Sequence, residues 1–455
     1  MISGTGNINK IGAGSITLAA ANTFSGILTI SSAILYASNN SALGQNSAIV
    51  QSGASIGLIN SQTIGIPITI NGLGVSNLGA ISNKSQDNQL YGNITLQSGS
   101  RIGSDLGKLT LLGNILCGVN SLTFISGGSG IIESSGVISG SGGVIVQIST
   151  GQVTLNGLNT FTGGMSIWNG IVNINTIKNF SSPSSIGADS TNPIQIGETT
   201  RSGTLNYQGV GDTTDRTVRI GFNGGTPAAT DIGTGTILSN GTGNLIFSAA
   251  NFNIQTNATT GVGAGRTLTL GGSSDGQISG IIRDNLVTAP ATGTAFISLV
   301  KSGAGKWTLS GANTFSGPTT VNAGYLIVAN ASALGTIATA TTVNSGGSLR
   351  VQGGILLAAE PLTISGSGSA SDGALANFSG TNSMSGAISM AADARINSIA
   401  GSLTISGAVN GATRTLTLGG AGTLTLSGII TLTTGGIIYD GAGILILSKD
   451  RKSVV

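Results

Sequence analysis

Residues 301–335 read KSGAGKWTLSGANTFSGPTTVNAGYLIVANASALG, and this stretch decides the fold. Apolar and polar residues alternate in its segment Lys306-Trp307-Thr308-Leu309. Successive side chains of a strand point to opposite faces, so Trp307 and Leu309 are expected in a core and Thr308 outside it. Glycines and an asparagine separate such runs, which predicts short strands joined by tight bends.

The same stretch recurs elsewhere in the chain. Residues 10–44 read KIGAGSITLAAANTFSGILTISSAILYASNNSALG and are identical to residues 301–335 at 19 of 35 positions, without a gap. Ile16 and Leu18 are therefore expected to point inward like their counterparts. A weaker third copy runs from Gln147 to Gly187 and contains VTLNGLNTFTGGMSIWNG. Internal repetition on this scale is typical of proteins built from stacked repeats.

A small set of turn residues marks the three copies. Each copy has an asparagine, which tolerates a left-handed backbone and can bond its own turn. A phenylalanine follows two positions later and is expected to fill a corner of the core. The next glycine is expected at a sharp bend, where a Cβ would be unfavourable. The repeat residues are Gly14, Asn22, Phe24, Gly26, Asn159, Phe161, Gly163, Gly305, Asn313, Phe315, Gly317 and Gly324.

Weaker strand-like runs, such as 266–270, 402–406, 414–418 and 423–427, continue the rhythm between the clear copies. Strands this short must pair with their counterparts in neighbouring coils. The sequence therefore predicts an all-β fold, a parallel β-helix (β-solenoid) that forms a single elongated rod over residues 1–449. At about 4.8 Å per coil and roughly 20 to 25 residues per coil, some 20 coils would extend on the order of 100 Å.

The run K-x-G-x-G-x-x-x-L-x-G-x-N-T-F-S-G-x-T-x-V-x-x-G-x-L at 301–326 resembles the autotransporter-associated β-strand repeat, also called the passenger-associated transport repeat. The copy at 10–35 has Ala20 and Ala33 where the pattern has glycine, and the copy at 147 lacks the leading lysine. The resemblance implies a right-handed β-helix passenger exported by type V secretion, with the repeat assisting export and folding. It also implies a location at the bacterial cell surface, in the outer membrane or outside the cell.

The two ends of the chain bear on that interpretation. Residues 1–6 have neither the basic nor the apolar region of a signal peptide, and no run of about 18 apolar residues could span a bilayer as a helix. If the chain is an exported passenger, we expect it to be an internal piece of a longer protein that also has an export signal and a C-terminal translocator barrel. Residues 450–455, DRKSVV, break the composition abruptly, and we interpret them as a non-native tail from a truncated contig.

The composition excludes several classes of protein. Gly contributes 76 residues and charged residues only 7%, so almost no helix is expected, while 39% hydrophobic residues in short alternating runs argue against disorder. The 18 basic residues form no stripe that could bind nucleic acid. Cys117 stands alone, so no intrachain disulfide is possible, and it is expected to be a small buried apolar residue.

The chain contains no histidine, which removes much of the chemistry that a site could use. Two segments, 53–57 and 272–276, match the nucleophile pattern G-x-S-x-G, but no Ser-His-Asp triad can form. Neither a histidine-rich nor a thiolate metal site is available either. We therefore expect no cofactor and no metal.

One alternative site remains, because parallel β-helices include polysaccharide lyases and hydrolases that use clustered acids. Asp212, Asp215 and Arg216 form the densest charged cluster. If the two aspartates faced one groove, they could act as an acid/base pair while the arginine bound an acidic sugar. The other reading is a polar loop with local ion pairs.

The sequence thus predicts a structural or adhesive surface protein and not an enzyme. The alternative is a carbohydrate-active β-helix enzyme, and a third reading is a spacer that carries another domain. Expected partners are host-cell or matrix glycans or proteins, or further copies of the chain, together with the translocator. Exposed Thr, Ser and Asn columns could form a flat adhesive face or serve only to solvate the surface.

Overall fold

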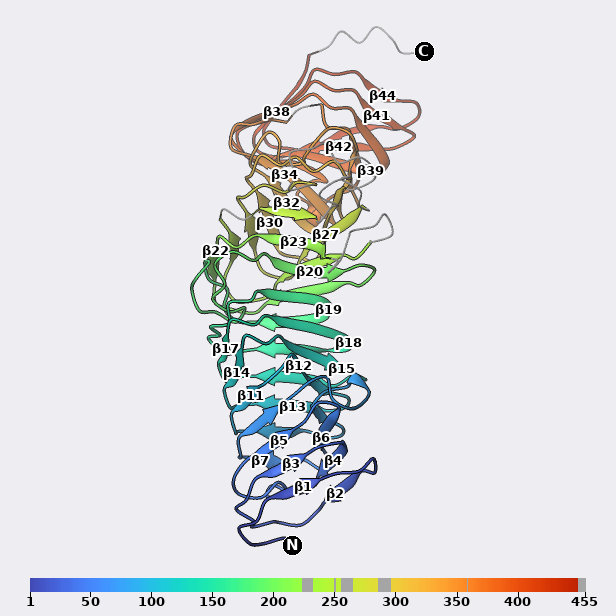
Figure 1. Ribbon diagram of the computed structural model, residues 1–455. Helices are drawn as coiled ribbons and strands as arrows, with labels where there is room; N and C mark the ends of the chain where they lie inside the picture. Colours follow the sequence, from blue (N-terminus) through green and yellow to red (C-terminus); the bar gives the residue numbers. More distant parts are fainter. Residues whose placement is uncertain (223–231, 249–250, 255–264, 285–295, 358, 449–455) are drawn as a thin grey trace. The chain divides into compact units, whose positions relative to one another are not determined.

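A computed structural model describes residues 1–222, 232–248, 251–254, 265–284, 296–357 and 359–448 (Figure 1). The chain divides into two compact units, Met1–Gly209 and Val210–Val455. In the described ranges it forms strands and two short 3-10 turns, η1 (Val75–Asn77) and η2 (Ser369–Ser371). The strands are parallel and stack in about 18 turns. The predicted parallel β-solenoid and the near absence of helix are confirmed.

The first unit is built from three stacks of parallel strands. Stack 1 is a seven-stranded sheet, and stacks 2 and 3 join where the long strands β18 and β19 run through both. Stack 1 contains β1 (Ile8–Lys10), β3 (Leu28–Ile30), β5 (Ala48–Val50), β8 (Ile68–Ile70), β11 (Ile94–Leu96), β14 (Ile115–Gly118) and β17 (Ile138–Gly140). Stack 2 contains β2 (Ile16–Leu18), β4 (Ala33–Ala37), β6 (Ala54–Leu58), β9 (Ile81–Asn83), β12 (Ser100–Ser104), β15 (Leu122–Ser126) and β20 (Ile194–Glu198). Stack 3 contains β7 (Thr63–Ile64), β10 (Asn88–Leu90), β13 (Lys108–Leu111), β16 (Ile131–Ser134) and β21 (Gly203–Tyr207), and the shared strands are β18 (Val144–Leu155) and β19 (Met165–Ile174).

The strands of the second unit also form three stacks. Stack 4 contains β24 (Gly235–Ser239), β27 (Arg266–Gly271), β29 (Ile297–Lys301), β31 (Thr319–Val321), β33 (Thr341–Val343), β36 (Leu362–Gly366), β41 (Val409–Ala412) and β44 (Ile430–Leu432). Stack 5 contains β22 (Asp212–Thr214), β25 (Leu245–Phe247), β28 (Gly276–Ile278), β30 (Lys306–Leu309), β32 (Gly324–Val328), β34 (Gly347–Gln352), β37 (Leu375–Ser379), β42 (Leu416–Gly419) and β45 (Ile437–Tyr439). Stack 6 contains β35 (Leu356–Leu357), β38 (Thr381–Met384), β40 (Ser402–Ile405), β43 (Thr423–Leu426) and β46 (Ile444–Leu447). The strand β39 (Ile388–Ser398) joins stacks 4 and 5, and β23 (Val218–Phe222) pairs with β26 (Phe252–Ile254).

The core consists of inward columns, each made of one side chain per coil. From β3 to β17 of stack 1 the paired residues of successive strands are between 0% and 2% exposed: Leu28, Ala48, Ile68, Ile94, Ile115 and Ile138. Complete burial of a large aliphatic side chain contributes about 1.5–3 kcal/mol. Because each coil covers the column of its neighbour, the hydrophobic stabilisation depends on stacking rather than on any one coil.

The predicted alternation is confirmed in both repeats. Trp307 and Leu309 are fully buried and Thr308 is half-buried, as predicted. Ile16 and Leu18 pair in register with the buried Leu35 and Ala37, so they belong to the same inward columns, although Ile16 is 44% exposed and Leu18 half-buried. Their strand β2 pairs with β4 on one side, and no described strand covers its other side. The prediction for residues 450–455 lies outside the described residues.

No helix within the described ranges has the length and apolar character needed to cross a membrane.

Candidate functional site

A buried asparagine in each repeat joins the coil before it to the coil after it. Asn313 is 3% exposed. Its Oδ1 accepts a 2.8 Å hydrogen bond from the backbone N–H of Ile282, and its Nδ2 donates a 2.6 Å bond to the carbonyl oxygen of Ala333. The same two bonds, all 2.8 Å long, join Asn22 to Ile2 and Ala42, and Asn159 to Ile138 and Ser185. We call each of these asparagines an inter-coil clamp.

The clamps differ from the prediction made for these asparagines. None of the three has a positive φ angle, so none uses the left-handed backbone that asparagine tolerates. Their side chains bond backbone groups that lie 20 to 31 residues away, not groups in their own turn. Buried backbone N–H and C=O groups need partners, and at the bends, where the strands end, the clamp provides them.

The repeat phenylalanines fill the core beside the clamps, as predicted. Phe24, Phe161 and Phe315 are at most 1% exposed. A Cβ on Gly44, one coil later, would lie 2.4 Å from the ring of Phe24, and Gly44 has a φ of +82°. The aromatic ring therefore occupies space that only a glycine leaves open. Gly187 and Gly335 have the same relation to Phe161 and Phe315. The sequence alone did not predict this role for the three glycines.

The other repeat glycines have different roles. A Cβ on Gly26, Gly163 or Gly317 would lie 2.1 to 2.3 Å from the backbone of the preceding coil, so close approach of coils, not a left-handed bend, requires glycine there. Gly305 is restricted in the same way, at 2.2 Å from a carbonyl oxygen. Gly324 has a φ of +62°. A Cβ on Gly14 would meet nothing within 4 Å, and nothing in its surroundings requires glycine.

A column of uncharged residues, all polar except Val300, runs along the outward face of stack 4. One residue per coil contributes, each paired in register with the next, at a spacing of about 4.8 Å. Three of its members, Ser389, Asn410 and Thr431, are exposed and the others are half-buried. We call it the hydroxyl column; it consists of Thr236, Thr269, Val300, Thr320, Thr342, Thr363, Ser389, Asn410 and Thr431.

A second polar column lies beside the hydroxyl column. Asn322 and Asn344 are both exposed, and the Nδ2 of Asn344 donates a 2.8 Å hydrogen bond to the Oδ1 of Asn322 in the coil before it. Stack 1 of the first unit has a comparable pair, because the Nδ2 of Asn71 bonds the Oε1 of Gln97 at 3.0 Å. Uncharged rows of hydroxyl and amide groups offer hydrogen-bond donors and acceptors to a partner at a regular spacing.

The three clamps lie within ranges that match a known protein family. Residues 8–36, 145–174 and 299–328 match the passenger-associated-transport-repeat family, and each matched range contains one clamp asparagine. The chain thus carries three passenger-associated transport repeats. It is 32% identical over 369 residues to the adhesin BmaC autotransporter of Brucella suis biovar 1 (strain 1330). That alignment covers 75% of the chain and 10% of the relative, so the chain spans about a tenth of that protein's length. No solved structure matches the chain significantly.

The leading lysine of the transport repeat has a structural role that the sequence analysis missed. Lys301 is fully buried, and its Nζ donates hydrogen bonds of 2.7 to 3.0 Å to the carbonyl oxygens of Ser302, Gly303 and Ala323. Burial lowers the pKa of Lys301 to about 8. Lys10 makes two such bonds, both 2.8 Å long, to Gly12 and Ser32. The ammonium group thus ties a bend to the following coil.

In the second transport repeat Val146, not Gln147, stands at this position, because fully buried Val146 pairs with Ile167 as Lys301 pairs with Val321. Gln147 matches the lysine only in the sequence alignment and is half-buried. Its Oε1 is buried and has no hydrogen-bond partner among the described residues. The second repeat therefore lacks the ammonium group that ties a bend to the following coil in the other two repeats.

The alternative catalytic residues lie in and just after β22. Asp212 is 8% and Arg216 is 2% exposed, and Asp215 is half-buried. The backbone N–H of Arg216 bonds the hydroxyl of Thr214 at 3.2 Å. Two of the three side chains are thus buried rather than facing a shared open groove. No cluster of three or more acidic or thiol side chains suited to a metal occurs among the described residues.

Cys117 is a buried, inert thiol. It is fully buried on β14, and burial raises its pKa to about 12. A thiol with so high a pKa forms almost no thiolate at neutral pH, and the thiolate is the reactive form. The sequence-based expectation of a small buried apolar residue is confirmed.

Proposed function

We propose that the chain acts as part of an adhesive or structural autotransporter passenger, displayed at the bacterial cell surface or released outside the cell. The observation that carries the proposal is the threefold recurrence of the inter-coil clamp within the three ranges that match the transport-repeat family. Similarity to a protein named as an autotransporter adhesin over 75% of the chain supports the same function.

The geometry of the clamp suggests how the repeat assists folding during export. A clamp asparagine has one partner in the preceding coil and one in the following coil, so both of its bonds exist only when three successive coils are in place. Addition of each coil therefore completes the bonds of the coil before it. Repeat proteins gain stability by such nearest-neighbour contacts.

We propose that adhesion depends on many weak contacts along the hydroxyl column. The partners would be host-cell or matrix glycans or proteins, or further copies of the chain. Export would require a translocator as a further partner. An uncharged surface of this kind gives binding little dependence on salt, in contrast to nucleic-acid binding, which we do not expect.

We propose further that the chain has no enzymatic activity of its own. Asp212 and Arg216 are too buried to serve as an accessible acid and a sugar-binding base in the structure. Incubation of the purified chain with a panel of acidic and neutral polysaccharides should release no reducing ends or unsaturated sugars. Release that is lost on Asp212→Asn substitution would instead establish the carbohydrate-active alternative.

Adhesion is tested by display of the chain on a non-adherent bacterium and measurement of binding to epithelial cells and to matrix-coated surfaces. In the test variant, Thr320, Thr342 and Thr363 are changed to Val, which removes three hydroxyls from the hydroxyl column and keeps the β-branched shape. In the control variant, the half-buried Thr308, Thr404 and Thr425 of stacks 5 and 6 are changed in the same way. We expect adhesion that the test variant lowers several-fold and the control variant preserves. Display without adhesion would support the spacer reading.

A further inference from the structure

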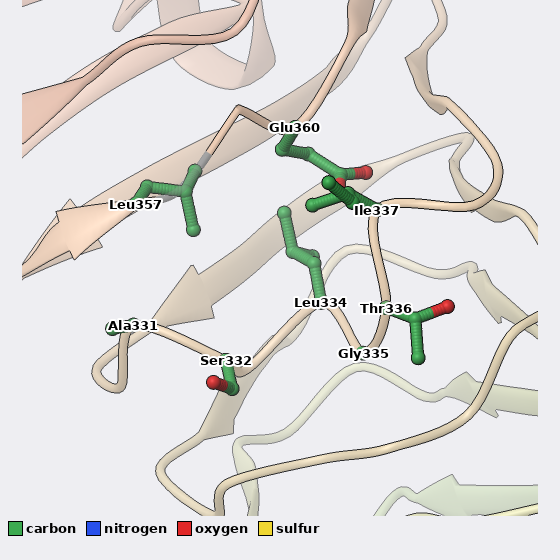
Figure 2. A pocket seen from close by; sticks show the side chains of 8 residues that line it. All are labelled: Ala331, Ser332, Leu334, Gly335, Thr336, Ile337, Leu357 and Glu360. Atoms are coloured by element: carbon green, nitrogen blue, oxygen red, sulfur yellow. The ribbon is translucent and has the colours of Figure 1, made fainter.

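A cavity of about 320 Å³ opens beside the last turn of the third transport repeat (Figure 2). Residues from two places in the chain surround it: the turn that follows β32, and Leu357 of β35 together with Glu360, which lies just before β36. A volume of this size holds about ten water molecules, at roughly 30 Å³ each. The cavity is large enough to hold an amino-acid side chain or a small molecule. The lining residues are Ala331, Ser332, Leu334, Gly335, Thr336, Ile337, Leu357 and Glu360.

The walls of the cavity are mainly apolar and its ionisable group is a single carboxylate. In Figure 2 the side chain of Leu334 projects between those of Leu357 and Ile337, toward Glu360. Leu334 and Leu357 are 4% and 2% exposed, whereas Ile337 is 57% exposed and lies at the mouth. Glu360 is the only ionisable residue among the eight that line the cavity.

The carboxylate of Glu360 has spare hydrogen-bonding capacity. Glu360 is 4% exposed, and its Oε1 accepts a 2.7 Å hydrogen bond from the hydroxyl of Thr341. No described lysine or arginine forms an ion pair with it. Burial raises the pKa of Glu360 to about 7, and the bond from Thr341 opposes this rise. A buried carboxylate is stabilised most strongly by an opposite charge.

The first transport repeat shows that the fold does not need an acid at this position. Glu360 precedes Pro361 and β36, and Ile66 precedes Pro67 and β8 in the equivalent coil. The backbone around the two residues is also the same. A Cβ on Gly386 would lie 1.8 Å from the carbonyl oxygen of Glu360, and a Cβ on Gly92 would lie 1.8 Å from that of Ile66. The same backbone therefore carries an isoleucine in one repeat and a carboxylate facing a cavity in the other.

We propose that this cavity is a binding site for a primary ammonium group on an alkyl chain, such as the side chain of a lysine, with Glu360 as its counter-ion. Leu334, Leu357 and Ile337 would cover the methylene groups while the ammonium reaches the free oxygen of Glu360. An ammonium group is a compact point charge and can form an ion pair with a single carboxylate oxygen. A guanidinium pairs best with both oxygens of a carboxylate, and Thr341 already occupies one of them. Calcium needs six to eight oxygen ligands, and the cavity offers a single carboxylate.

The site goes beyond the adhesive function proposed above and can be tested independently of it. The full chain, with isotope-labelled methyl groups, is titrated at pH 8 with Nα-acetyl-lysine methylamide, and the methyl resonances of Leu334, Ile337 and Leu357 are followed by NMR. The norleucine analogue, which has the methylenes without the charge, is the matched ligand control. Glu360→Gln removes the charge, and Glu360→Ile introduces the residue that the first repeat tolerates.

We expect saturable shifts of these methyl resonances with the lysine amide. Binding should weaken at least tenfold with norleucine amide and in both variants. A parallel titration with 1,5-diaminopentane distinguishes a free diamine from a lysine side chain as the source of the ammonium group. Saturable binding of either the lysine amide or the diamine supports the site. Absence of saturable shifts with both ligands, or equal binding by the Glu360→Gln protein, would overturn the proposal. Nα-acetyl-arginine methylamide is titrated in the same way, and tighter binding of this ligand than of the lysine amide would overturn the choice of a primary ammonium.

Discussion

The Oδ1 of Asn313 accepts a 2.8 Å hydrogen bond from the backbone N–H of Ile282, which lies 31 residues earlier in the chain. The Nδ2 of the same side chain bonds the next coil at Ala333. One amide thus holds three successive coils in register, and the first two repeats use Asn22 and Asn159 in the same way.

Asn313→Ala should strongly destabilise the second unit. The substitution leaves the N–H of Ile282 and the carbonyl of Ala333 buried without partners, which together cost about 3 kcal/mol at 1–3 kcal/mol each. Urea unfolding followed by tryptophan fluorescence measures the free energy of unfolding. Asn344→Ala, which removes an exposed inter-coil amide bond, is the control and should change this free energy by less than about 0.5 kcal/mol. Equal effects of the two substitutions would contradict the clamp.

Ala33→Gly should stabilise the first unit. Ala33 has a φ of +56° at the position where the third repeat has Gly324, with a φ of +62°. A left-handed backbone costs an alanine about 1–2 kcal/mol, part of which the greater unfolded-state entropy of glycine offsets. We expect a gain of about 1 kcal/mol in thermal or urea unfolding.

The control for this substitution is Ala20→Gly. Ala20 also replaces a glycine of the repeat pattern but has no positive φ angle. That substitution should therefore leave the stability unchanged or lower it. A gain from both substitutions would show that left-handed strain at Ala33 is not the cause.

Thr319→Val should also be stabilising. Thr319 is 2% exposed, and its Oγ1 has no hydrogen-bond partner among the described residues. Valine keeps the shape and removes an unsatisfied hydroxyl, for an expected gain of about 1 kcal/mol. Thr341→Val is the matched change one coil later and should be destabilising at neutral pH, since it removes the bond to Glu360. The comparison needs only the melting temperatures of the two variants, and a loss of stability in both would exclude the expected gain.

Glu360→Gln should make the second unit less sensitive to pH. The pKa of Glu360 is about 7 in the folded chain, above its usual value of 4.5, so between these pH values the folded state binds more protons than the unfolded state. The stability contributed by protonated Glu360 is complete below pH 4.5 and is lost as the pH rises through 7. Integration of this difference gives about 3 kcal/mol.

The glutamine protein should therefore exceed the original protein in stability at pH 8 and match it near pH 4. Unfolding curves at several pH values check this expectation. Parallel pH profiles for the two proteins would mean that the folded structure does not raise the pKa of Glu360.

Local patterns in the sequence predicted much of the fold but not the bonds between coils. Alternation placed Trp307 and Leu309 in the core, and recurrence of Phe315 placed an aromatic there, because both depend on strand geometry and hydrophobicity alone. The partners of Asn313 could not be predicted, since the coil before it and the coil after it differ in length. The sequence alone gave no sign of the buried Lys301 either, because the carbonyl groups that hold it come from two separate bends.

Surface exposure is the most direct test of the central claim, that this chain is an autotransporter passenger built from clamped coils. The chain is produced between an export signal and an autotransporter translocator in a Gram-negative host, and the fraction of intact cells that an antibody to the chain labels is measured. The account predicts efficient labelling, with a marked loss when Asn22, Asn159 and Asn313 are all changed to alanine. Failure of the original chain to reach the surface while an established passenger does so, or undiminished export of the triple variant, would contradict it.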